Sequence, residues 1–290
     1  MSNSNNVKEW PGRENEETAE LESNLPSAES TDSSQHDAPQ RSKRGIYLLP
    51  NLLTTGTLFG GFYAILAGLQ GDFEAAAIAI FAAMFFDGLD GRVARLTKTQ
   101  SEFGVEYDSL SDMVAFGVAP AVLVYVWILE PLGSFGWSVS FIYVSCAALR
   151  LARFNVRSAK QDKRFFTGLA SPPAAALVAG MVWSGSSLDA SWFSALGPAL
   201  LTGAAGLLMV SNIRYLSFKD VNFAHKVPFA VVFGICMVIA IVMVDPPRVL
   251  LILALCYALY APILTAVRLT KKLKKFSIAG LFGRIKDIDR

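Results

Sequence analysis

The sequence contains little charge and few cysteines. Charged residues make up 17% of its 290 positions, hydrophobic residues make up 53%, and the mean hydropathy is +0.41. This balance is too apolar for an ordinary soluble domain. The three cysteines, Cys146, Cys236 and Cys256, all lie inside apolar runs, where we interpret them as small buried side chains rather than disulfides or metal ligands.

Large apolar residues are scarce in residues 1–44, where Glu, Asp, Ser, Asn and Pro dominate from Asn15 to Gln40. Such a segment cannot bury enough surface to offset the entropy lost on ordering, so we expect a disordered, acidic cytosolic tail. The segment also has no basic stretch followed by an apolar core, so we do not expect a secretory signal.

The rest of the chain holds apolar stretches long enough to cross a bilayer, which takes about 20 residues per helix. We expect residues 45–269 to form an all-α transmembrane bundle of about eight helices, and residues 270–290 to form a basic cytosolic tail. The expected spans are Leu49–Leu69, Phe73–Val93, Leu110–Leu129, Gly136–Phe154, Pro172–Ser187, Phe193–Ile213, Val227–Val244 and Val249–Val267.

Links that are rich in lysine and arginine alternate with links that have almost none. They gather before the first span, after the second, between the fourth and fifth, between the sixth and seventh, and after the eighth, whereas Arg248 is the only cation in the other links. Because cytosolic links carry an excess of Lys and Arg, both termini and the basic links are expected in the cytosol. The C-terminal run Lys271–Lys275, with Phe276, Leu281 and Phe282 after it, either lies on an anionic leaflet or only sets the topology.

Four aspartates form the clearest functional feature: Asp87, Asp90, Asp108 and Asp112. Ionisable groups at membrane depth are costly and usually mark function. At helical spacing the first two lie on or beside one helix face, and the last two share one face of a second helix. Gly104 is expected in the link between these helices, where it would let the chain turn back. Two adjacent helices can therefore direct four carboxylates into one cytosol-facing cavity.

Carboxylates this close repel one another unless cations neutralise them, and hard divalent ions such as Mg²⁺ or Mn²⁺ suit oxygen ligands. Gly91 and Ala94 leave room for a bulky ligand beside the acids, and Arg95 can hold a phosphate. No His or Cys lies nearby to favour zinc. The pattern indicates phosphoryl chemistry, in which metal ions neutralise phosphate charge. The alternative is a structural role, in which the acids pair with Arg92, Arg95 and Lys98.

From Asp87 to Asp112 the chain follows the pattern D-x2-D-G-x2-A-R-x8-G-x3-D-x3-D. This resembles the signature of the CDP-alcohol phosphatidyltransferases at every fixed position. The resemblance implies that Asp87, Asp90 and Asp108 bind metal, as two Mg²⁺ or Mn²⁺ ions. It implies that Asp112 contributes to the metal site and acts as general base on the acceptor hydroxyl. It also implies that the CDP group is cradled by Gly91, Ala94, Arg95 and Gly104.

Four further stretches resemble the bacterial phosphatidylserine synthase branch of that family. They are residues 50–54 (PNLLT), 148–155 (ALRLARFN), 168–172 (GLASP, with Ala170 where Pro is usual) and 211–219 (SNIRYLSFK). Eight spans, rather than the six of many relatives, fit the same branch. The resemblance implies that Asn51 and Thr54 contact CDP-diacylglycerol and that L-serine is the acceptor. It further implies a homodimer among the lipids of the bacterial inner membrane, with its active site facing the cytosol and no nucleic acid partner.

L-Serine carries a carboxylate, for which a pocket should offer an arginine. Arg150 and Arg153 lie three positions apart at the inner end of the fourth expected span, and Arg153 is the favoured candidate. Either could instead hold the lipid phosphate or reach the headgroups. Asn155 and Ser171 are further candidates for acceptor or phosphate contact.

Three other interpretations remain open. Within the family, glycerol 3-phosphate, inositol phosphate or choline could replace serine, because the signature does not report the acceptor pocket. An ion-coupled transporter would spread its acids over several, often broken, helices, whereas these acids cluster on two adjacent ones. A non-catalytic scaffold gives no reason for four carboxylates beside Gly91 and Ala94.

Overall fold

The computed structural model of the chain describes residues 43–97, 101–157, 165–216 and 229–288, which all belong to the unit Arg41–Arg290. The acidic tail expected at residues 1–44 falls almost entirely outside the described residues. The helix at the C-terminus continues through the segment expected to form the basic tail, and it ends at Ile288.

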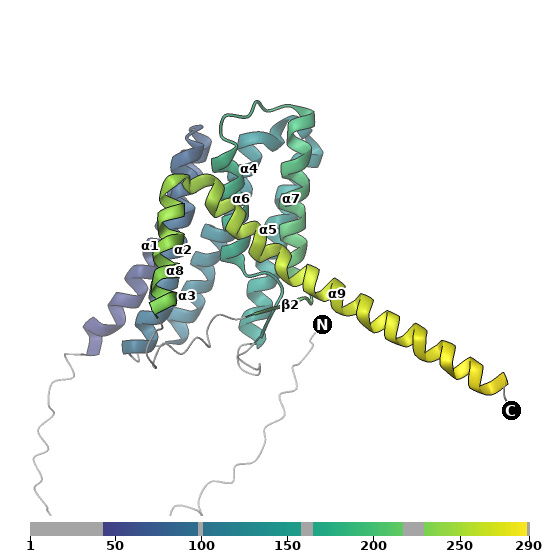
Figure 1. The fold of residues 1–290 in the computed structure, drawn as a ribbon. Coiled ribbons are helices and arrows are strands. Elements are labelled where there is room, and N and C mark those ends of the chain that lie inside the picture. Colours follow the sequence, from purple (N-terminus) through teal and green to yellow (C-terminus); the bar gives the residue numbers. More distant parts are fainter. Residues whose placement is uncertain (1–42, 98–100, 158–164, 217–228, 289–290) are drawn as a thin grey trace, which may run out of the picture. The chain divides into compact units, whose positions relative to one another are not determined.

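The described part of the chain is helical apart from one short antiparallel ribbon (Figure 1). Its elements are α1 (Lys43–Leu69), α2 (Phe73–Thr97), α3 (Glu102–Asp112), η2 (Met113–Val118), α4 (Ala119–Val124), η3 (Tyr125–Leu129), η4 (Glu130–Leu132), α5 (Ser134–Arg157), β1 (Phe165–Thr167), α6 (Ser171–Ser184), α7 (Trp192–Val210), β2 (Arg214–Leu216), α8 (Phe229–Val244) and α9 (Pro246–Ile288). The expectation of an all-α fold therefore holds for the described bundle, and the two-stranded ribbon was not expected.

Five helical segments of the described chain are long and apolar enough to cross a membrane. They are Leu49–Leu69, Glu102–Leu132, Ser134–Val156, Trp192–Val210 and Pro246–Val267. The other expected spans correspond to α2, which carries Asp87 and Asp90, and to α6 and α8, which have 14 and 16 residues. These two lengths fall short of the roughly 20 residues of a typical span. The count of eight and the side of each terminus stay predictions.

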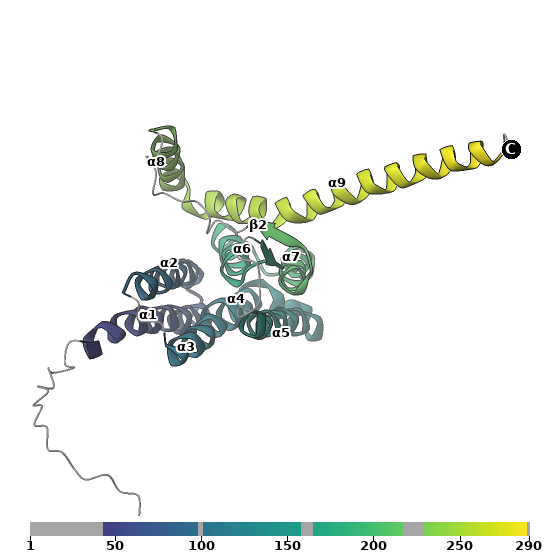
Figure 2. The same cartoon turned by 90° about the horizontal axis from the view of Figure 1, so that it is seen from below.

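Small residues bring α1 close to its neighbours. A Cβ added at Gly60 would lie 3.0 Å from the Cβ of Ala83 on α2, and one added at Gly61 would lie 2.5 Å from the Cα of Ala115 on η2. Small residues at such positions let helix backbones approach closely, which is how membrane helices gain packing energy. The end-on view shows α1 beside α2 and α6 beside α7 (Figure 2). This packing fixes the first turns of α1 against the acidic end of α2.

One continuous helical stretch runs from α3 to η4, and it is wound unevenly. The η2 and η3 segments are π-helical, and the backbone N–H of Ala119 donates to the carbonyl of Val114, five residues back. Each π segment is followed two residues later by a proline, Pro120 or Pro131, which has no N–H to donate to a regular helix. π turns often occur at functional sites, and this one begins directly after Asp112, so it points to this stretch as a candidate site.

The β1–β2 ribbon pairs Phe166 with Tyr215 and holds the chain that leads into α6. Gly168 has φ +85°, and a Cβ there would lie 2.2 Å from the carbonyl oxygen of Met209. Only glycine accepts both the backbone conformation and this close approach. The backbone N–H of Leu169 then donates to the carbonyl of Leu208 at 3.0 Å. The start of α6, and with it Ser171, is thereby held against the end of α7.

Candidate metal centre and active site

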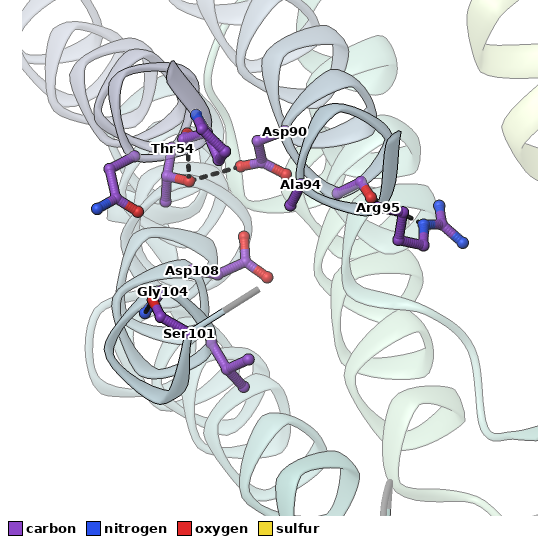
Figure 3. A pocket seen from close by; sticks show the side chains of 11 residues that line it. Thr54, Asp90, Ala94, Arg95, Ser101, Gly104 and Asp108 are labelled. Atoms are coloured by element: carbon purple, nitrogen blue, oxygen red, sulfur yellow. Dashed lines mark hydrogen bonds between the residues drawn. The ribbon is translucent and has the colours of Figure 1, made fainter. Parts of the chain in front are cut away.

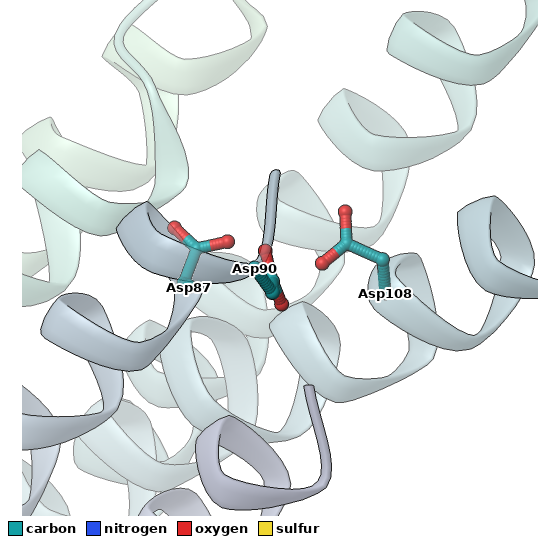
Figure 4. A group of neighbouring side chains, drawn as sticks. All are labelled: Asp87, Asp90 and Asp108. Carbon is teal, nitrogen blue, oxygen red and sulfur yellow. The ribbon is translucent and has the colours of Figure 1, made fainter. Parts of the chain in front are cut away.

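The acids of the candidate site come from the end of α2 and from α3. One carboxylate oxygen from each of Asp87, Asp90 and Asp108 lies within 4.8 Å of the other two (Figure 4). The spacing of three between Asp87 and Asp90 turns both toward α3, as the sequence predicts. The fourth acid, Asp112, lies one helical turn beyond Asp108 and contacts the carboxyl group of Asp87. The structure thus brings all four predicted aspartates into one cluster.

Asp90 is held by a hydrogen bond from a neighbouring helix. Its side chain is buried, and the hydroxyl of Thr54 on α1 donates a hydrogen bond to its Oδ2 at 2.8 Å (Figure 3). The same hydroxyl lies 3.1 Å from the carbonyl oxygen of Pro50, one turn earlier. Thr54 is itself buried, so its rotamer is fixed by the packing of α1 on α2. The orientation of the Asp90 carboxylate follows from this contact.

The cluster fits a divalent metal ion. Among the described residues, Oδ1 of Asp108 and Oδ1 of Asp112 are buried and have no hydrogen-bond partner. Buried carboxylate oxygens of this kind are costly unless a cation or a donor satisfies them. Every donor in the cluster is a carboxylate oxygen, the ligand type that Mg²⁺ and Mn²⁺ prefer. The residues present therefore suit the metal that the sequence predicts, while the identity and number of ions stay predictions.

A cavity of about 310 Å³ opens beside Asp90 and Asp108 (Figure 3). Its lining contains the six residues predicted to contact the CDP-lipid: Asn51, Thr54, Gly91, Ala94, Arg95 and Gly104. Pro50, from the stretch 50–54, lines it as well, together with Ser101 and Val105, which the sequence did not point to. Ser101 could have been found as a helix-capping residue, because its Oγ accepts the backbone N–H of Gly104 at 3.0 Å.

The prediction that Gly104 lies in the link between the two helices is wrong. It occupies the first turn of α3, because the Ser101 cap starts the helix before it. A Cβ at Gly104 would lie 3.6 Å from Oδ1 of Asn51 and 3.1 Å from Oγ of Ser101. The absence of a side chain at Gly104 therefore leaves space next to Asn51 in the wall of the cavity. It does not serve to reverse the chain direction.

The side chain of Arg95 turns back onto its own helix, and its predicted contact with a phosphate stays a prediction. Its Nε donates to the carbonyl oxygen of Gly91 at 2.8 Å, and its guanidinium group points away from Asp108 (Figure 3). The side chain is exposed, so rotation about its torsions is open to it. The alternative of a structural ion pair with Asp87 or Asp90 is not what this conformation shows either, since the contact is with the backbone.

The two arginines of α5 have different surroundings. Arg150 lies among the acids, interacts electrostatically with Asp112 and Asp87, and donates from Nη1 to Oγ of the fully buried Ser171. Arg153 instead donates to the carbonyl oxygen of Val210 at 3.2 Å and to Oδ1 of Asn212 at 2.6 Å. The geometry therefore places Arg150 beside the candidate site and Arg153 at the end of α7, and the choice of the arginine that contacts the acceptor stays a prediction.

The remaining acceptor candidate, Asn155, connects α5 to α3. Its Nδ2 donates to Oγ of Ser109 at 3.0 Å, and Ser109 directly follows Asp108. This contact positions the helix that carries Asp108 and Asp112. Of the four acceptor candidates, the structure therefore brings Arg150 and Ser171 together beside the acids, and it places Arg153 and Asn155 in contacts between helices.

Comparisons with known proteins identify the family of the chain. The family model described as CDP-alcohol phosphatidyltransferase matches residues 47–232. A CDP-diacylglycerol–serine O-phosphatidyltransferase of Helicobacter pylori is 39% identical over 220 residues, which cover 74% of this chain and 90% of that protein. Another, of Methanocaldococcus jannaschii, is 35% identical over 219 residues, or 76% and 94% of the two chains. An archaetidylserine synthase of Methanothermobacter thermautotrophicus is 37% identical over 169 residues, or 58% and 69%. The chain, with its acid cluster inside the matched range, belongs to the CDP-alcohol phosphatidyltransferase family.

Proposed function

We propose that this protein transfers the phosphatidyl group of CDP-diacylglycerol to the hydroxyl of L-serine, giving phosphatidylserine and CMP. The observation that carries the proposal is the cluster of Asp87, Asp90 and Asp108 beside a cavity lined by Thr54 and Gly91. The names of the relatives from Helicobacter pylori and Methanocaldococcus jannaschii support serine as the acceptor.

The acids would hold the divalent metal. Asp87, Asp90 and Asp108 supply oxygens close enough to share an ion, and Asp112 lies against Asp87 to complete or extend the site. A bound Mg²⁺ or Mn²⁺ would neutralise negative charge on the two phosphates of the CDP group. We propose two ions per site, since four carboxylates are present. Thr54 fixes one carboxylate of the set through its hydrogen bond to Asp90.

Two side chains of the protein have the roles of general base and of acceptor binding. Asp112 accepts the proton of the serine hydroxyl, and the serine oxygen forms a bond to the phosphorus that carries diacylglycerol. The bond between that phosphorus and the bridging oxygen of CMP breaks, and CMP leaves with the electron pair. Arg150, beside Asp112, binds the carboxylate of serine and so directs its hydroxyl toward the base.

The setting of this reaction is also a proposal. Eight spans, with α2, α6 and α8 added to the five segments found above, would place both termini and the acid cluster on the cytosolic side of a bacterial inner membrane. CDP-diacylglycerol would then enter from the bilayer and serine from the cytosol. A homodimer would fit the family resemblance.

The test uses the purified full-length chain in lipid nanodiscs with CDP-diacylglycerol, Mn²⁺ or Mg²⁺, and labelled acceptors. The acceptors are L-serine, glycerol 3-phosphate, inositol phosphate and choline, and the readouts are CMP release and the lipid product. We expect phosphatidylserine from serine, and no CMP release when the metal is chelated. A lipid product from glycerol 3-phosphate with none from serine would overturn the choice of acceptor.

A further inference from the structure

The π-helical segment η2 joins the end of α3 that carries Asp112 to the core of the bundle. It begins at Met113, directly after Asp112, and continues into α4 without an intervening loop. Among the residues of α3, all of which the structure describes, only Ser111 is buried, whereas residues 115–117 of η2 are all buried. The position of Asp112 therefore depends on how η2 is held.

The winding of η2 sets the rotation of α3. A π turn contains more residues than the 3.6 of an α-helical turn, and each residue of an α-helix turns the chain by about 100°. In η2 the backbone N–H of Ala119 donates to the carbonyl of Val114, five residues back. A change to regular winding would therefore rotate Asp112, and Asp108 one turn before it, relative to α2.

One carbonyl of this turn receives its hydrogen bond from another helix. In a regular α-helix the carbonyl oxygen of Phe116 would accept the N–H of the residue four positions later, but that residue is Pro120, which has no N–H. The hydroxyl of Tyr143 on α5 donates to this oxygen at 3.1 Å, and the side chains of Tyr143 and Phe116 are fully buried. The tyrosine thus supplies a donor where regular winding would lack one.

Close packing on two sides fixes Tyr143. A Cβ added at Gly206 of α7 would lie 3.2 Å from the Cα of Tyr143. One turn further along α5, the Cβ of Ala147 lies 3.3 Å from the position of a Cβ added at Gly117 of η2. Small residues at such positions let helices approach closely. Because α5 is held against both α7 and η2, the Tyr143 hydroxyl has a fixed position relative to the π turn.

The other end of α3 is held by different contacts. Ser101 caps its first turn, and the hydroxyl of Tyr107 in its middle lies 2.9 Å from that of Thr55 on α1. This end of α3 also lines the cavity. Loss of the Tyr143 contact should therefore displace Asp112 and leave the cavity wall at the start of α3 in place.

We propose that Tyr143 is a positioning residue for Asp112: its hydroxyl stabilises the π turn at Phe116 and so fixes the rotation of α3 that directs the Asp112 carboxylate toward the acceptor hydroxyl. The inference rests on the proposed function, in which Asp112 accepts the proton of the acceptor. Proton transfer requires the base within hydrogen-bond reach of that proton, so a small rotation of α3 lowers the rate of the chemical step.

The test is Tyr143→Phe in the full-length chain, which keeps the buried ring and removes only the hydroxyl. CMP release from CDP-diacylglycerol is followed in lipid nanodiscs at saturating L-serine. We expect kcat to fall by about 10- to 100-fold, since a displacement of about 1 Å in a catalytic site costs about 100-fold. The KM for CDP-diacylglycerol should stay close to the wild-type value, because the cavity wall is unaffected.

The matched control is Tyr215→Phe. Tyr215 is also buried, and its hydroxyl donates to a backbone carbonyl of another helix, that of Ala258 on α9, at 3.0 Å. Both variants should lower the melting temperature, whereas only Tyr143→Phe should lower kcat. An equal loss of kcat in the two variants, a wild-type kcat in Tyr143→Phe, or a loss that falls mainly on the KM for CDP-diacylglycerol overturns the inference.

A second variant moves the π turn without removing the hydroxyl, and it decides the question if Tyr143→Phe does not fold. Gly117→Ala places a Cβ 3.3 Å from that of Ala147, so η2 and α5 must separate by a few tenths of an ångström. We expect a lower kcat with no fall in melting temperature, because alanine favours a helix more than glycine does. The control is Gly203→Ala on α7, where an added Cβ meets Cγ1 of Val139 only at 3.9 Å. Equal kcat values in the two alanine variants contradict the inference.

Asp112→Asn distinguishes a failure of the inference from a failure of the proposed function. If Asp112→Asn loses turnover while Tyr143→Phe keeps it, only the inference fails. If Asp112→Asn keeps full turnover, the proposed role of Asp112 fails, and the inference fails with it.

Discussion

The hydroxyl of Thr54 lies 2.8 Å from Oδ2 of Asp90, and both side chains are buried where α1 packs on α2. This contact links the first membrane helix to the acid cluster. It gives Thr54 a role in orienting a metal ligand, in addition to its place in the wall of the cavity. Partners of this kind commonly tune the affinity of the ligands that they hold.

Removing the Thr54 hydroxyl should lower the affinity of the acid cluster for its metal ion without abolishing binding. We expect Thr54→Val, which keeps the shape of the side chain, to lower activity at limiting Mn²⁺ by about 10- to 100-fold, the usual effect of removing a partner of a metal ligand. Thr54→Ser should restore most of it. The matched control is Thr57→Val, one turn further along α1, because the buried Thr57 hydroxyl approaches only the backbone carbonyls of Leu53 and Ala83 in the described contacts. The titration of activity against Mn²⁺ measures the difference, and equal losses at both threonines would contradict this role.

Asp112 is predicted to remove the proton from the acceptor. Asp112→Asn keeps the size of the side chain and removes its basicity, so we expect turnover to fall by about 100- to 10,000-fold, the usual contribution of general base catalysis. Binding of CDP-diacylglycerol, followed by the rise in melting temperature that it causes, should be largely kept. Full activity in this variant would show that another group takes the proton.

The control for Asp112→Asn is Glu106→Gln on the same helix. Glu106 is exposed and lies two positions before Asp108, so the change removes one negative charge near the cluster without touching its ligands. We expect its turnover to stay within twofold of wild type. A loss as large as that of Asp112→Asn would mean that the general charge of α3, and not a specific base, controls the rate.

Substitutions of the two arginines of α5 should affect different properties of the protein. Arg150→Lys removes the planar fork beside Asp112, so the KM for serine should rise by about tenfold or more while the fold is kept. Arg153→Lys weakens contacts to Val210 and Asn212 at the end of α7, so it should lower the melting temperature and leave the serine KM nearly unchanged. Steady-state kinetics and thermal unfolding of both variants measure this, and the opposite assignment would support the ranking made from the sequence.

The acid cluster could be predicted from the sequence because it depends on local spacing. Aspartates three and four positions apart must share a helix face, and the structure needed only to pair α2 with α3 to bring Asp87, Asp90 and Asp108 together. The resemblance to the family pointed to Gly91 and Ala94 through the signature and to Thr54 through residues 50–54, and all three lie in the wall of the cavity. Membership of the family was predicted in the same way and is confirmed.

Features set by contacts between distant segments could not be read in this way. Arg150 and Arg153 are three positions apart and look alike in sequence, but only tertiary packing decides that Ser171 meets one and Asn212 the other. The start of α3 depends on a more local feature: Ser101 caps the helix, so the helix begins before Gly104 and not after it. The π-helical turn after Asp112 is only weakly indicated by the sequence. Pro120 points to an irregular turn before it only when the helix is known to continue past the proline.

The cavity wall at Gly91 allows a test of where the CDP-lipid binds. A Cβ added at Gly91 or at Gly88 meets no atom within 4 Å, so both positions of α2 can accept a side chain without a clash in the folded protein. Only Gly91 belongs to the described lining of the cavity. Gly91→Leu should therefore raise the KM for CDP-diacylglycerol by a factor that corresponds to about 1–3 kcal/mol, the common cost of overpacking. Gly88→Leu, the matched control, should keep the wild-type KM, and both variants should melt at or above the wild-type temperature because leucine favours a helix more than glycine does. Equal KM values in the two variants would place the CDP group elsewhere than beside Asp90 and Asp108.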